Sequence, residues 1–111
     1  MSSDYQIVLC TCPDKATAEN IALLLVENNL AACVNILPNI TSIYRWQEQI
    51  ECAEELLLII KARTEAYPAL ESMIKAHHPY QVPEIIAVSI EHGLPEYLHW
   101  IDSCHLATHF F

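Results

Sequence analysis

The sequence predicts an α+β fold in which one antiparallel sheet is covered by two helices and followed by an extra C-terminal helix. Apolar, β-rich runs alternate with helical patterns in the order β-α-β and then β-α-β. No linker or low-complexity segment divides the 111 residues, and this length is typical of one domain. We therefore expect a single domain over residues 1–111.

The first β-α-β unit begins with an apolar run at residues 6–11, which predicts a strand covered on both faces. Apolar residues then recur at i, i+3, i+4 and i+7 and predict a helix over about residues 15–28, with Asp14 as its N-cap. A second strand is expected at residues 33–36, and Pro38-Asn39 should end it.

The second unit begins with a long hairpin, whose arms are predicted at residues 41–46 and 50–61. The chain has one glycine, Gly93, although several of its turns would ordinarily use a positive φ. Asn39 tolerates the left-handed region, whereas Glu48 at the hairpin tip would cost about 1 kcal/mol there. The tip therefore either carries that cost or adopts a different loop.

The second helix should begin between Thr64 and Pro68, because proline is tolerated in a first turn, and should continue to His77. A strand at residues 85–90 and a short helix at residues 94–101 complete the pattern. Two split halves of this size imply a ferredoxin-like sandwich with both helices on one face of the sheet. The other face needs a cover, and we expect a second subunit to provide it.

Composition narrows the classes of partner. Hydrophobic residues make up 53% of the chain and the mean hydropathy is +0.23, which favours an oligomer with apolar surface at its interfaces. Five basic against 14 acidic residues give a formal charge of −9, so nucleic acid is not expected as a partner and cations are attracted. No apolar run approaches the ~18 residues of a membrane span, so no membrane partner is expected.

The start of the chain and its cysteines bear on location. Ser2-Ser3-Asp4 follows Met1 with no basic or apolar leader segment, so we expect a cytoplasmic protein. Five cysteines without a CxxC pair match no structural zinc spacing. Reduced thiols are the default in the cytoplasm.

The most informative segment runs from His77 to Glu84. Pro79 pushes His78 out of the helical region, and Pro83 keeps the following residues extended. Imidazole is the commonest protein metal ligand and titrates near neutral pH. The pair of histidines is therefore either a pair of metal ligands or a structural corner between a helix and a strand.

Several motifs in register resemble the CutA family of divalent-cation tolerance proteins over about residues 5–102. They are Asn35-Ile36-Leu37-Pro38, Thr41-Ser42-Ile43-Tyr44 with Trp46, Leu58-Ile59-Ile60-Lys61, His77-His78-Pro79-Tyr80 with Val82-Pro83-Glu84, and Glu96-Tyr97-Leu98 with Trp100-Ile101. The resemblance implies a cytoplasmic, ferredoxin-like homotrimer that binds copper, as Cu2+ or Cu+, with zinc and other divalent cations as alternatives. The thiols Cys12, Cys52 and Cys104 are not part of the family pattern.

The resemblance also implies that Cys10, His77 and His78 are the metal ligands. Thiolate and imidazole suit copper and zinc better than magnesium or calcium. Against this, each residue could simply be structural: cysteine is often buried in a core, and His77 falls on the apolar face of its helix, whereas His78 is better placed to reach solvent or a partner chain.

Strand direction adds an objection. We expect the first and third strands to run parallel, which would place Cys10 at the opposite end of the subunit from His77 and His78. Metal–ligand bonds are about 2.0–2.3 Å long, so either subunits share the site or these residues form no single site. Cys10 and Cys12, at i and i+2 on a strand, offer another soft pair about 6.5–7 Å apart at Cα, although two buried core residues are the plainer interpretation.

Three functions compete. The first is a trimeric metal-binding protein of cation tolerance or homeostasis, and the second is a PII-like small-molecule sensor with ligand sites between subunits. The third is an anchoring scaffold. An enzyme is not expected, because no catalytic motif is present, although polar and aromatic side chains could line a cleft: Trp46, Glu51, Glu54, Lys61, Tyr80 and Glu84.

Overall fold

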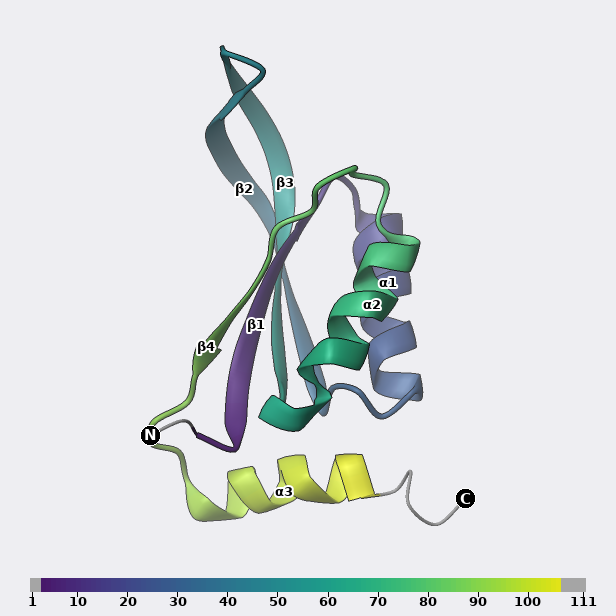
Figure 1. The fold of residues 1–111 in the computed structure, drawn as a ribbon, viewed down its shortest axis with the longest axis vertical. Coiled ribbons are helices and arrows are strands. Elements are labelled where there is room, and N and C mark those ends of the chain that lie inside the picture. The colour runs from purple at the N-terminus through teal and green to yellow at the C-terminus, as the bar shows by residue number, and fades with distance from the viewer. Residues whose placement is uncertain (1–2, 107–111) are drawn as a thin grey trace.

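The computed structural model describes residues 3–106 and contains one four-stranded sheet and three α-helices (Figure 1). The elements are β1 (Tyr5–Cys12), α1 (Lys15–Glu27), β2 (Cys33–Trp46), β3 (Gln49–Arg63), a 3-10 turn (Thr64–Ala66), α2 (Tyr67–His77), β4 (Ile85–Ser89) and α3 (Pro95–Leu106). The strands lie in the order β2-β3-β1-β4, and every neighbouring pair is antiparallel. The predicted α+β class with one antiparallel sheet is confirmed.

Helices α1 and α2 lie side by side on one face of the sheet, as expected (Figure 1). The carboxylate of Asp14 accepts a hydrogen bond from the Thr17 N–H at 2.7 Å and caps α1. Pro68 occupies the first turn of α2, where it removes no intrahelical bond. The core beneath the helices combines their inner faces with alternate residues of the sheet: Val8, Cys10, Cys12, Ala18, Ile21, Leu25, Leu58, Ile60, Leu70 and Ile74.

The prediction that Pro38 and Asn39 end the second strand is wrong. β2 continues through them with a bulge between Leu37 and Ile40. A proline is tolerated because β2 is the edge strand, so one side of its backbone has no partner strand to accept hydrogen bonds. Asn39 adopts a φ of 59° at the bulge, which asparagine tolerates better than most residues.

The hairpin between β2 and β3 extends beyond the helices and ends in a two-residue turn (Figure 1). Gln47 and Glu48 have φ values of 50° and 67°, and Trp46 pairs with Gln49. Positive φ at both central residues is the pattern of a type I′ turn, which matches the twist of the flanking strands. Glu48 therefore adopts the left-handed conformation without the help of glycine.

The expectation that the first and third strands run parallel is wrong. β1 and β3 are antiparallel, with Tyr5 opposite Arg63 and Cys12 opposite Leu56. The helical crossover α1 makes β2 parallel to β1, and the hairpin then reverses the chain, so β3 must run opposite to β1. As a result α2 begins beside the first residue of β1 and ends beside its last, which brings His78 to the cysteine end.

Helix α3 is longer than the predicted helix at residues 94–101 and lies across one end of the sheet (Figure 1). The Tyr5 hydroxyl donates to Asp102 at 2.7 Å, and the Arg63 guanidinium also binds Asp102. The Arg63 backbone N–H donates to His105 Nε2 at 3.2 Å, and Ile101 is fully buried. Contacts with distant strands extend this helix, which local propensity alone could not predict.

Large apolar side chains remain exposed on the sheet face opposite α1 and α2. Ile86 and Val88 of β4 are 53% and 55% exposed. Their cross-strand partners on that face are Leu9 and Ile7 of β1. In the part of the chain that the structure describes, no helix is long and apolar enough to cross a membrane.

Candidate metal centre

Three ligand atoms converge at the end of β1. The thiol sulfurs of Cys10 and Cys12 and a ring nitrogen of His78 all lie within 4.8 Å of one another. Both cysteines are 0% exposed and His78 is 8% exposed. Among residues 3–106, this is the group of histidine, cysteine or acidic side chains with the spacing of a metal site.

The local sequence explains why these residues meet. Cys10 and Cys12 are two residues apart on a strand and therefore point to the same face, toward the helices. Pro79 ends α2, and His78 takes extended angles of φ −92° and ψ 137° as its C-cap. The change of backbone direction turns the imidazole inward against β1.

Both ring nitrogens of His78 already have partners. The Tyr80 backbone N–H donates to Nδ1 at 3.1 Å. Nδ1 is therefore the acceptor nitrogen, and Nε2 carries the proton that it donates to the Thr11 carbonyl at 2.8 Å. The ring is neutral in this arrangement, and a metal ion at His78 must replace one of these two hydrogen bonds.

The two thiols ionise unequally. The hydrogen bond to Cys12 and burial raise the pKa of Cys10. The neighbouring Cys10 thiol lowers the pKa of Cys12, although the Cys10 Sγ also lies 3.7 Å from the Thr11 carbonyl oxygen, to which its S–H donates. The pair therefore loses its first proton more readily from Cys12 than from Cys10.

Two sulfurs and one imidazole nitrogen form a soft donor set, which suits Cu+ and zinc far better than magnesium or calcium. With bonds of about 2.0–2.3 Å, three ligands arranged trigonally around one ion lie about 3.5–4.0 Å apart. The ligand atoms of the cluster lie within 4.8 Å of one another, so binding requires the widest pair to contract by up to about 1 Å. A rotation of one side chain can supply this contraction.

The three predicted ligands do not all lie together. Cys10 and His78 meet in one subunit, contrary to the expectation that they lie at opposite ends, because β1 and β3 are antiparallel. His77 is exposed, and its Nδ1 bonds to the Met73 carbonyl at 2.9 Å. The relative exposure expected for the two histidines is therefore reversed. Cys12 takes the third position, and its i, i+2 spacing from Cys10 was the sequence signal for it.

The fold and this cluster define a small α+β protein with a buried thiol–imidazole group of metal-binding type. Residues 6–104 match the family described as CutA1 divalent ion tolerance protein. The chain belongs to this family, which is named for ion tolerance and not for an enzymatic reaction.

Individual relatives agree in sequence and in fold. The divalent-cation tolerance protein CutA of Thermus thermophilus is 52% identical over 96 residues, which cover 86% of this chain and 93% of that protein. Its solved structure gives a TM-score of 0.86 over 87% of this chain and 94% of that one. CutA from Xylella fastidiosa is 46% identical with a TM-score of 0.89, over 92% and 98% of the two chains. An Archaeoglobus fulgidus CutA described as periplasmic is 42% identical, also with a TM-score of 0.89, over 91% and 98%.

Proposed function

We propose that this chain forms a ferredoxin-like homotrimer that binds copper in the cytoplasm and acts in cation tolerance. The observation that supports copper most directly is the convergence of Cys10, Cys12 and His78, buried and within 4.8 Å of one another. Membership of a family named for divalent-ion tolerance supports the role in cation tolerance.

The donor set favours Cu+ as the bound form. Thiolates stabilise Cu+ strongly, and a site closed to water favours the low coordination number that two sulfurs and one nitrogen provide. Cys10, Cys12 and His78 would hold the ion, with His78 exchanging its hydrogen bond to Thr11 for the metal. Zinc is the leading alternative, because it accepts the same ligands.

His77 has a different place in this proposal. Its Nδ1 bonds to the Met73 carbonyl, so Nε2 is the nitrogen that could bind an ion on the surface. The side chain is exposed and adjacent to His78 in sequence. We expect it to meet incoming Cu+ at the surface and to add little to the affinity of the buried cluster.

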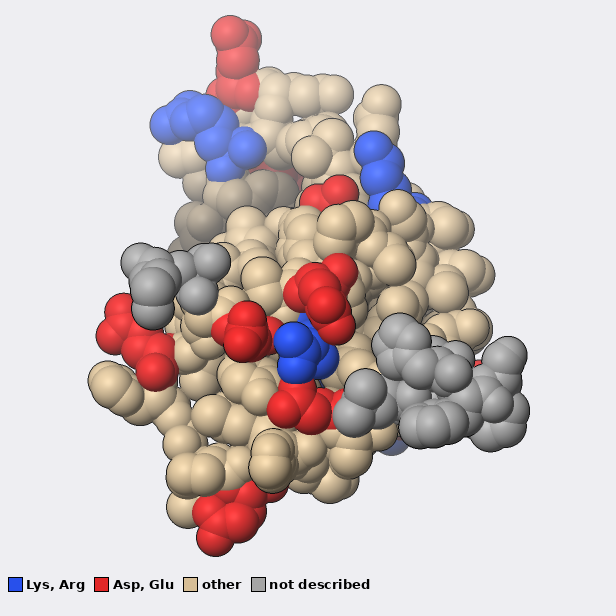
Figure 2. Space-filling view, turned by 60° about the horizontal axis from the view of Figure 1, so that its bottom comes forward, with Lys and Arg blue, Asp and Glu red and all other residues tan. Residues whose placement is uncertain are grey.

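The surface charge is compatible with a cationic ligand. Fourteen acidic residues oppose five basic ones, and Figure 2 shows acidic side chains spread over one face, with basic ones between them at its centre and toward its upper edge. A negative field raises the local concentration of cations and the rate at which they arrive.

Titration with Cu+ under anaerobic, reducing conditions, in competition with a chromogenic Cu+ chelator, tests the site. We expect Cys10→Ala, Cys12→Ala and His78→Ala each to weaken binding by at least about 10–100-fold, the range that loss of even an outer-shell partner causes. Cys52→Ala removes an exposed thiol and His77→Ala removes the exposed imidazole, so both should bind as the wild type does. Equal loss in the controls, or wild-type binding no tighter than that of the cluster variants, would show that the cluster is not the site.

The cytoplasmic location rests on the need for reduced thiols, since an oxidising compartment favours loss of the thiolate ligands. The Archaeoglobus fulgidus relative is described as periplasmic, so location must be measured for this chain. Fractionation of the native host should place the protein with cytoplasmic markers, with all five cysteines accessible to thiol reagents after denaturation. Recovery with periplasmic markers would contradict this part of the proposal.

A further inference from the structure

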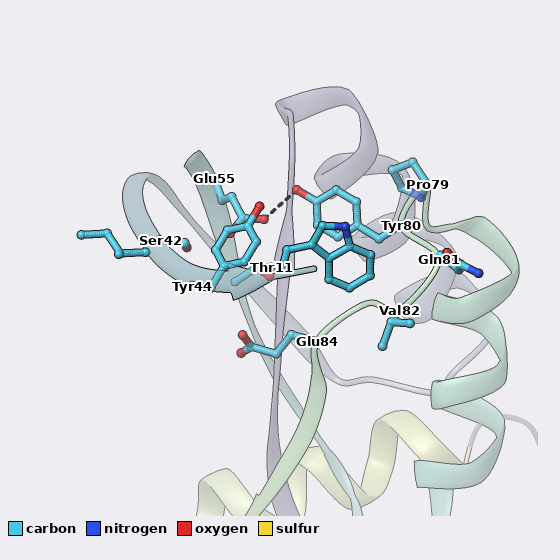
Figure 3. Close-up of a pocket in the computed structure, with 11 residues that line it drawn as sticks. Thr11, Ser42, Tyr44, Glu55, Pro79, Tyr80, Gln81, Val82 and Glu84 are labelled. Carbon is cyan, nitrogen blue, oxygen red and sulfur yellow. Dashed lines mark hydrogen bonds between the residues drawn. The ribbon is translucent and has the colours of Figure 1, made fainter. Parts of the chain in front are cut away.

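A cavity lies on the other side of β1 from the metal cluster. Its volume is about 680 Å³, within the range of small-molecule sites. The hairpin of β2 and β3 forms one wall and the segment at residues 79–84 forms the other (Figure 3). Thr11, which lies between the two cluster cysteines, also lines it.

The side chains of the cavity have an unusual combination of properties. Three aromatic residues, Tyr44, Trp46 and Tyr80, are joined by two carboxylates, those of Glu55 and Glu84. Among the described residues that line the cavity, none is a lysine or an arginine. Aromatic faces attract cations through their quadrupole, and carboxylates attract them by charge, so the lining is built for a positive ligand.

The carboxylate of Glu55 is the group in this cavity whose charge a positive ligand would best compensate. The Glu55 side chain points toward the Tyr80 hydroxyl (Figure 3), and Glu55 is only 6% exposed. The Tyr80 hydroxyl donates to one carboxylate oxygen at 2.7 Å. The ion pairs within residues 3–106 join Lys15 with Glu19, and Arg63 with Glu65 and Asp102, so no side-chain cation of the described chain compensates Glu55. Burial of a carboxylate without a cation is costly.

Tyr80 holds this arrangement in one protonation state. Burial and the hydrogen bond to Glu55 raise the pKa of Tyr80, so its hydroxyl remains a donor at physiological pH. The hydrogen bond fixes the position of one carboxylate oxygen of Glu55, and because the carboxylate is planar it also limits the orientation of the other oxygen. The carboxylate is oriented before any ligand arrives, which lowers the entropic cost of binding.

We propose that this cavity binds a small organic cation of the quaternary or primary ammonium class. The rings of Tyr44, Trp46 and Tyr80 would contact its alkylammonium group, and Glu55 would supply the counter-charge. A metal ion would use only the carboxylate and hydroxyl oxygens of this lining, whereas an alkylammonium group would also contact the three aromatic faces. The site is separate from the thiol cluster, since Cys10 and Cys12 point to the opposite face of β1.

Calorimetric titration of the purified oligomer with choline tests the ligand class directly. Its neutral carbon analogue, 3,3-dimethylbutan-1-ol, has the same shape without the charge and serves as the matched ligand. We expect choline to bind at least about tenfold more tightly than the analogue, the ratio that a partly desolvated cation–π contact gives. Equal binding of the two, no binding of choline at millimolar concentration, or full competition by Mg2+ would each overturn the proposal.

Two variants locate the binding. Glu55→Gln keeps an acceptor for the Tyr80 hydroxyl but removes the charge, and Tyr44→Leu removes a ring that is 43% exposed. Each should weaken choline binding by about tenfold, while Glu27→Gln and Tyr97→Leu, which change the same residue types outside the cavity, should leave it within about twofold. If the control variants weaken choline as much as the cavity variants, the cation binds elsewhere and the assignment is wrong.

Discussion

At the scale of single residues, the thiol–imidazole cluster depends on the residue at which α2 ends. The resemblance to the CutA family pointed to Cys10, His77 and His78 as ligands, and the proline after the histidine pair indicated a corner between a helix and a strand. Which histidine turns inward follows from the last helical residue, and a shift of one position exchanges them. The sequence does not define helix ends that closely, so His77 and His78 could not be distinguished from pattern alone.

The packing of α3 against β3 should depend on pH, because it involves the partly buried His105. Burial and the nearby charge of Arg63 lower the pKa of His105, although Glu65 and Asp102 oppose this. The neutral ring accepts a hydrogen bond from the Arg63 N–H, which the protonated ring could not do. The contribution of this hydrogen bond to the free energy of unfolding is therefore complete above the ordinary histidine pKa of about 6.5. It declines as the pH falls below that value.

The fluorescence of Trp100 on α3, measured in a Trp46→Phe background, reports this change. We expect its emission to shift as the pH falls from neutrality through the pKa of His105. His105→Gln keeps a hydrogen-bond acceptor that does not titrate in this range, so it should abolish the shift. An unchanged pH profile in His105→Gln would exclude His105 as the group responsible.

At the scale of elements, the periodic helices and strands and the β2–β3 hairpin were predictable, whereas the continuation of β2 through Pro38 and the direction of β3 were not. Apolar spacing gave α1 with its Asp14 cap, and proline placement gave the start of α2. The end of the second strand was predicted wrongly at Pro38. A proline disrupts a central strand but is tolerated in an edge strand, and only the assembled sheet shows that β2 lies at an edge. The direction of β3 relative to β1 followed from topology, and the error there separated Cys10 from His78.

The hairpin turn offers a test of local strain. Glu48 has a φ of 67°, so Glu48→Gly should raise the free energy of unfolding by up to about 1 kcal/mol. Glu19→Gly, in an exposed interior position of α1, should instead lower it by a similar amount, since glycine disfavours helix interiors by ~1 kcal/mol. Denaturant unfolding at one fixed protein concentration measures both. A loss of stability in Glu48→Gly would show that the turn is not strained at this residue.

At the scale of the whole molecule, the apolar sheet face opposite α1 and α2 favours association with another chain. Val88 is 55% exposed beside other apolar side chains of that face, and in the proposed trimer neighbouring copies of the chain would cover this part of it. Val88→Asp should therefore sediment as a monomer or unfold. Leu23→Asp, at a position of α1 that is 58% exposed, should sediment as the wild type does. A wild-type monomer would refute the proposed trimer.

The predicted fold class followed from the order of elements, which composition and periodicity reveal well. The binding properties required the folded chain, because both sites join residues far apart in sequence across β1. Cys12 and His78 meet at the metal cluster, while Tyr80 and Glu55 meet at the cavity. The segment that starts at His78 serves both sites, one on each side of the strand.

X-ray absorption spectroscopy at the copper edge, on protein loaded with one Cu+ per chain, tests the central claim most directly. We expect two sulfur ligands and one nitrogen ligand at about 2.0–2.3 Å, with the sulfur contribution halved in Cys12→Ala. A copper environment of nitrogen and oxygen alone, or one unchanged by loss of Cys12, would contradict that claim.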